Sequence, residues 1–122
     1  MNKIIIEPFG ELAISRPNLA AALDLIATWG DNPNRAKIGR LCAAAIGLCL
    51  PGAKLPGYSM IDCDPIAYGG QCLDRLLRAG LTASQVYEHG VLLINYCAEL
   101  LPSEKEVKEA ENFTIHPKAA AV

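Results

Sequence analysis

The feature that most constrains this 122-residue chain is a strongly apolar run that follows a short basic stretch. Residues 35–50 read RAKIGRLCAAAIGLCL. Small residues recur in it at spacings of three and four, at Ala36, Gly39, Ala43 and Gly47. This spacing places them on one helix face, where a second helix backbone can approach closely. Larger apolar residues fill most of the remaining circumference, so the run predicts a helix in the middle of a hydrophobic core.

A membrane-spanning helix is the alternative, because small residues also mark helix pairs in bilayers. The uncharged part of the run, from Leu41 to Ala53, has only 13 residues, whereas a spanning helix needs about 20. The apolar start of the chain is interrupted at Glu7 and Pro8, which argues against an export signal. We therefore expect no membrane segment and a cytoplasmic protein.

Composition is that of a folded domain: 52% of the residues are hydrophobic, 20% are charged, and the net charge is -2. This balance excludes a disordered chain and offers no basic excess for nucleic acid. We expect one helical domain over residues 1–113, in which residues 1–15 form an extended arm, and a flexible tail over residues 114–122. Two short strands within the arm can pair as a hairpin or lie separately on the helices, and the sequence leaves both open.

Helix periodicity and capping residues predict an all-α bundle of four main helices and a short C-terminal one. Pro at the first helical position after Asp64, and the pairs Thr82/Gln85 and Ser103/Glu106, are typical helix starts. The expected helices run over residues 18–29, 35–50, 65–78, 83–101 and 103–112. Their expected inner faces are Leu19, Leu23, Ile26 and Trp29 on the first; Ile66, Gly69, Gly70, Leu73, Leu76 and Leu77 on the third; and Val86, Gly90, Leu93, Ile94, Cys97, Leu100 and Leu101 on the fourth.

The five cysteines are odd in number and lack the close pairs typical of zinc sites. We interpret them as reduced core residues and predict neither a metal nor a cofactor. In Asp62-Cys63-Asp64 the flanking carboxylates would raise the pKa of the thiol and oppose thiolate chemistry. His89 has no partner that the sequence specifies, and His116 lies in the expected tail. We therefore predict that the protein is not an enzyme, although a pocket between helices is invisible in sequence.

Two stretches are candidates for binding another protein or a second copy of this chain. The loop after residue 50 carries apolar side chains among prolines and glycines, and the C-terminal stretch carries a thin apolar line. The candidate partner-binding residues are Leu55, Tyr58, Met60, Ile61, Val107 and Phe113. Tyr and Met suit contact surfaces because they bury area while tolerating imperfect fit. The alternative is that both stretches only cover the domain's own core.

A second functional class is a small regulatory module that binds nucleic acid. Its candidate residues are Arg35, Lys37, Arg40, Arg75 and Arg78. A nucleic-acid surface usually gathers more charge than this, so we expect these side chains to be solvated or paired with acids such as Asp31 and Asp74.

In the stretches IGRLCAAAIG, DPIAYGGQCLDRLLRAGL and EVKEAENFT, the chain resembles small helical proteins encoded in the morphogenesis regions of tailed phages and prophages. The resemblance implies a non-enzymatic role in particle assembly, such as that of a tail-assembly chaperone or another virion accessory, with phage structural proteins as partners. It implies no functional residues, because no site motif accompanies it.

Overall fold

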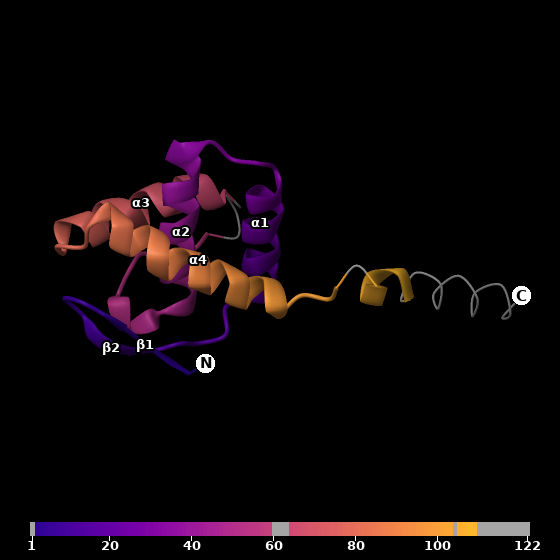
Figure 1. Cartoon of the computed structure of the whole chain (residues 1–122), viewed down its shortest axis with the longest axis horizontal. Coiled ribbons are helices and arrows are strands. Elements are labelled where there is room, and N and C mark those ends of the chain that lie inside the picture. The colour runs from indigo at the N-terminus through magenta and orange to yellow at the C-terminus, as the bar shows by residue number, and fades with distance from the viewer. Residues whose placement is uncertain (1, 60–63, 104, 110–122) are drawn as a thin grey trace, which may run out of the picture.

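The apolar run forms helix α2 (Arg35–Cys49), which lies in the middle of the bundle as predicted. Asn34 caps its start, because the side-chain oxygen accepts a hydrogen bond from the Lys37 amide at 3.1 Å. Helices α3 (Pro65–Arg78) and α4 (Ala83–Glu99) each pack extensively on α2 and touch one another far less. Figure 1 shows α2 crossing between them, with α1 (Leu19–Gly30) alongside.

The computed structural model describes residues 2–59, 64–103 and 105–109. Besides the four main helices it contains a two-stranded hairpin, a single 3-10 turn η1 (Pro51–Ala53) and a short helix over residues 105–109. The predicted all-α class, with four main helices and a short C-terminal one, is confirmed. Met60, Ile61 and Phe113, together with Asp62, Cys63, His116 and the expected tail, lie outside the described residues.

Two glycines bring the outer helices onto the backbone of α2. A Cβ atom at Gly69 of α3 would collide with the main-chain carbonyl of Arg40, and one at Gly90 of α4 would collide with the main chain of Cys42. Gly70, by contrast, would meet only the Arg40 side chain, at 3.9 Å. Both glycines are predicted on the inner face of the third helix. Gly69 makes the close approach, at Arg40 rather than at the line of small residues, and Gly70 does not.

The predicted helix starts are also confirmed in detail. Asp64 accepts hydrogen bonds from the first amides of α3, and Thr82 and Gln85 form a reciprocal capping box on α4. The Ser103 hydroxyl accepts from the Glu106 amide at 3.2 Å, ahead of residues 105–109. Gly80, between α3 and α4, has φ of 106°, which glycine adopts without strain.

Two predicted inner faces are confirmed only in part. Ile26 and Trp29 of α1, and Ile66, Leu73 and Leu76 of α3, lie in the core or pack against it as predicted. On α1 the buried residues are Ala21, Ala22 and Leu25, whereas Leu19 and Leu23 are 49% and 53% exposed. Small side chains let α1 lie close to the bundle, and the larger leucines are left outside.

On α3 the buried face is rotated from the predicted one. Because Gly69 must meet the backbone of α2, its flanking residues Tyr68, Cys72 and Leu76 turn inward and Leu77 turns outward. The prediction for α4 holds from Val86 to Cys97.

The N-terminal arm is a hairpin that also lies on the helices. Strands β1 (Lys3–Ile6) and β2 (Gly10–Ala13) pair antiparallel, with Ile4 opposite Leu12. The side chains that alternate inward on the two strands are buried against the bundle, including Ile4, Ile6 and Leu12. Two hydrogen bonds hold the hairpin on the helices. Gln85 Nε2 donates to the Glu7 carbonyl at 3.2 Å. Just beyond β2, the Ser15 amide donates to the Cys49 carbonyl at 2.8 Å.

Candidate functional site

The loop that follows α2 was the first predicted contact segment, and it begins with a turn that reverses the chain. After η1, Lys54 takes a left-handed conformation with φ of 54°. Ala53 is buried and Leu55 is half buried against the core. The described part of the loop therefore covers apolar surface of its own domain at Leu55.

Two tyrosines attach the loop to the helices. The Tyr58 hydroxyl donates to the Asp24 carboxylate of α1 at 3.1 Å, and the Tyr68 hydroxyl of α3 donates to the Pro56 carbonyl at 2.6 Å. Their rings meet edge to face, with centroids 5.2 Å apart, a geometry that adds about 0.5–1.5 kcal/mol beyond the area buried. Burial, followed by the interactions with Cys72 and Cys49, raises the pKa of Tyr68.

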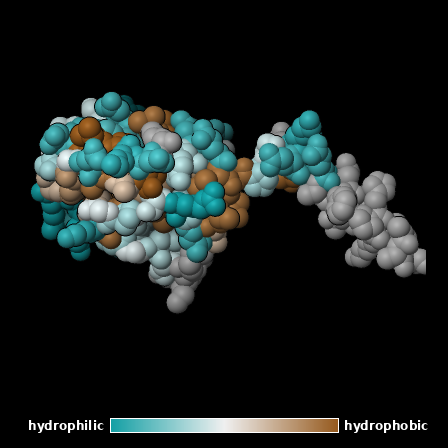
Figure 2. Space-filling view, turned by 90° about the horizontal axis from the view of Figure 1, so that it is seen from below, coloured by the Kyte–Doolittle hydropathy of each residue, from teal (hydrophilic) through white to brown (hydrophobic). Residues whose placement is uncertain are grey.

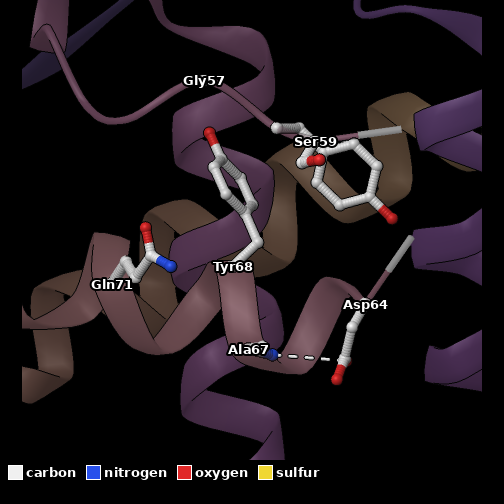
Figure 3. A pocket seen from close by; sticks show the side chains of 7 residues that line it. Gly57, Ser59, Asp64, Ala67, Tyr68 and Gln71 are labelled. Carbon is white, nitrogen blue, oxygen red and sulfur yellow. Dashed lines mark hydrogen bonds between the residues drawn. The ribbon is translucent and has the colours of Figure 1, made fainter. Parts of the chain in front are cut away.

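A groove runs along this loop. Its larger part has a volume of about 430 Å³ and lies among α1, α2, α3 and the loop. That part is lined by Asn18, Ala21, Gly47, Leu48, Pro51, Leu55, Pro56, Gly57, Tyr58 and Tyr68. A smaller hollow of about 120 Å³ shares Gly57, Tyr58 and Tyr68 with it and extends to Asp64 and Gln71 (Figure 3).

Three polar groups around the hollow have hydrogen-bond partners in the protein. Figure 3 shows the Asp64 carboxylate turned back to the Ala67 amide, at 3.3 Å, as a helix cap. Both tyrosine hydroxyls donate to protein oxygens. The groove is suited to contact with apolar groups.

The other titratable candidates are not brought to this groove. His89 lies on α4, and its Nδ1 is buried without a hydrogen-bond partner in the described part of the chain. Within residues 2–59, 64–103 and 105–109, no group of three His, Cys, Asp or Glu side chains is placed to hold a metal ion.

The second predicted contact segment stands clear of the bundle. Residues 105–109 are helical and exposed, with Val107 41% exposed, and Figures 1 and 2 show this short helix beyond the end of α4. The two predicted segments are therefore separate, since the loop lies on the bundle and the C-terminal helix does not.

The basic candidates for nucleic acid are all exposed, in two groups. Arg35, Lys37 and Arg40 lie in the first turns of α2, at the top of Figure 1, and Arg75 and Arg78 lie at the end of α3, at its left edge. Arg78 pairs with Asp74 at 3.1 Å, as expected for a solvated helix face.

Sequence reasoning missed two further features. Apolar side chains lie on the outer faces of α1 and α4, as the pairs Leu19/Leu23 and Tyr87/Val91, each one helical turn apart. The other feature is a contact between two buried thiols, Cys49 Sγ and Cys97 Sγ, at 3.6 Å. The spacing of Leu19 and Leu23, four residues apart, is visible in the sequence, but there it predicts the inner face of α1.

The described helices include none that is both long and apolar enough to cross a bilayer. Comparison of the chain with protein-family models, with curated proteins and with solved structures finds no match.

Proposed function

We propose that this protein is a non-enzymatic assembly accessory that binds another protein chain through apolar side chains on the outside of its bundle. The observation that carries the proposal is the pair Leu19 and Leu23, half exposed and one turn apart on α1. Burying a leucine side chain fully is worth about 1.5–3 kcal/mol. Two leucines presented together on a regular helix thus offer a partner a ready apolar contact.

Further support comes from α4 and the C-terminal helix. Tyr87 and Val91 repeat the one-turn spacing on α4, and Val107 is exposed on the short helix that leaves the bundle. Rows of apolar residues at this spacing are what a helix offers when it docks on another helix or in a groove. The partner that fits is therefore a chain with an apolar helix face, either a second copy or a structural protein.

The resemblance to phage morphogenesis proteins supports a role in particle assembly, and in the tail in particular. The test is co-expression with the products of the neighbouring genes, followed by purification and light scattering over a range of concentrations. Leu19→Ser with Leu23→Ser should abolish the complex or the self-association while the melting temperature stays unchanged. The matched control is Ala20→Ser with Ala27→Ser, equally exposed on α1, which should bind normally.

The same preparation tests the nucleic-acid alternative. Phosphate contacts weaken steeply as salt rises, so retention on heparin that disappears with Arg35→Ala and Arg40→Ala would favour that class. If wild-type protein forms no complex with itself or with any neighbouring product, the assembly proposal fails.

A further inference from the structure

Cys49 of α2 and Cys97 of α4 face each other inside the core. Their sulfur atoms lie 3.6 Å apart and neither residue is exposed. A disulfide has an S–S length of about 2.05 Å, so the sulfurs need to move about 1.5 Å closer to bond. In this structure both are free thiols.

The two helix backbones touch at a point near this pair. A Cβ atom at Gly90 would collide with the main chain of Cys42, so α4 rests directly on α2 at that point. Cys49 lies seven positions after Cys42 on α2, and Cys97 lies seven positions after Gly90 on α4. Seven residues are about two helical turns, so the thiols occupy the same facing stripes as Cys42 and Gly90. Disulfides require short Cα separations, and the Gly90 contact brings α4 onto the backbone of α2 two turns away from the thiols.

The hydrogen bond between the two thiols shifts their pKa values in opposite directions. The bond between them lowers the pKa of Cys97, against the effect of burial, and together with burial it raises the pKa of Cys49. Either sulfur can be the donor in this contact, and a thiol becomes reactive in its thiolate form. Cys97 also lies two residues before the end of α4, where helix ends open most readily.

We propose that Cys49 and Cys97 are a peroxide-sensitive dithiol that closes to a disulfide joining α2 to α4. The Cys97 thiolate attacks one oxygen of hydrogen peroxide, the O–O bond breaks, and the departing hydroxide takes up a proton to become water. The Cys49 sulfur then attacks the resulting sulfenic acid, the S–O bond breaks, and hydroxide leaves with the Cys49 proton as a second water. Two thiols are oxidised and one peroxide is reduced.

Cys72 is not part of this pair. Burial raises the pKa of its thiol to about 11, and the Tyr68 hydrogen bond and Arg75 oppose the rise only in part. It serves as the internal control for oxidation of buried thiols in general.

The experiment is peroxide titration of the folded full-length protein near neutral pH, followed by alkylation under denaturing conditions and peptide mapping. All proteins carry Cys63→Ser, which removes the cysteine outside the described residues. We expect a peptide that links Cys49 to Cys97, lighter by two hydrogens, with Cys42 and Cys72 still alkylated. Dithiothreitol should reverse the link, and the oxidised protein should melt at a higher temperature than the reduced one.

Cys72→Ala should retain the link, and Cys97→Ala should lose it without forming another. The proposal is overturned if Cys97 accumulates as sulfinic acid without a link, if every thiol stays alkylatable, or if the link forms only after denaturation. Should Cys97→Ala fail to fold, the peptide map of the protein that retains both Cys49 and Cys97 tests the proposal without that variant.

Discussion

At the residue scale, adjacent glycines on α3 have opposite roles. Gly69 faces the Arg40 carbonyl, and no side chain fits between them, whereas Gly70 lies beside the Arg40 side chain with room for a methyl group. Both occupy a helix interior, where glycine costs roughly 0.5–1 kcal/mol relative to alanine. One glycine is therefore required by packing and its neighbour is not.

Gly69→Ala should lower the free energy of unfolding by several kcal/mol, because α3 must move away from the backbone of α2. Gly70→Ala is the matched control and should be neutral or stabilise the protein by up to about 1 kcal/mol. Urea unfolding followed by circular dichroism measures both. Equal effects of the two substitutions would contradict the close approach at Gly69.

At the scale of elements, the two predicted contact segments differ in how they are attached to the bundle. The loop is held to α1 and α3 by the hydroxyls of Tyr58 and Tyr68 and by their edge-to-face contact. Residues 105–109 are all exposed, and Ser103 provides a cap without adding a packing surface. A helix this short is marginal in water without packing, and residues 105–109 gain no burial from the bundle.

Tyr58→Ser should therefore lower the melting temperature by several degrees, since it removes a half-buried ring and the bond to Asp24, each worth on the order of 1 kcal/mol. Val107→Ser should leave the melting temperature unchanged, because that side chain touches solvent. Differential scanning calorimetry of the two variants compares them directly. If Tyr58→Ser melts at the same temperature as the wild type, the loop does not stabilise the core. That result would favour the loop as a docking surface.

At the scale of the whole molecule, α2 lies between α3 and α4, and the described cysteines are all buried around it. Burial raises the pKa of Cys42 and of Cys72 from 9.0 to about 11. The folded protein thus keeps these protons at pH values where the unfolded chain releases them. Between about pH 9 and 11 the unfolded state binds fewer protons, so stability falls as pH rises.

We expect full stability below about pH 9 and a loss approaching on the order of 1 kcal/mol per pH unit for each such thiol above it. Urea midpoints measured at intervals from about pH 7 to about pH 11 test this expectation. Cys72→Ala removes one titrating group and should make the decline less steep. A midpoint that stays constant up to about pH 11 would show that these thiols are accessible to solvent in the folded protein.

The sequence by itself determined the elements and their ends, because caps and periodicity act within a few residues of chain. Asp64, Thr82 and Ser103 start helices where predicted, and the apolar run is the central helix. Which face of α1 and α3 turns inward was decided only by tertiary structure. Close approach favoured Ala21 and Ala22 over larger leucines, and Gly69 set the rotation of α3. The groove at Tyr58 and Tyr68 and the thiol contact at Cys49 and Cys97 join residues far apart in the chain. No local pattern encodes such a meeting, because it depends on how three helices pack at once.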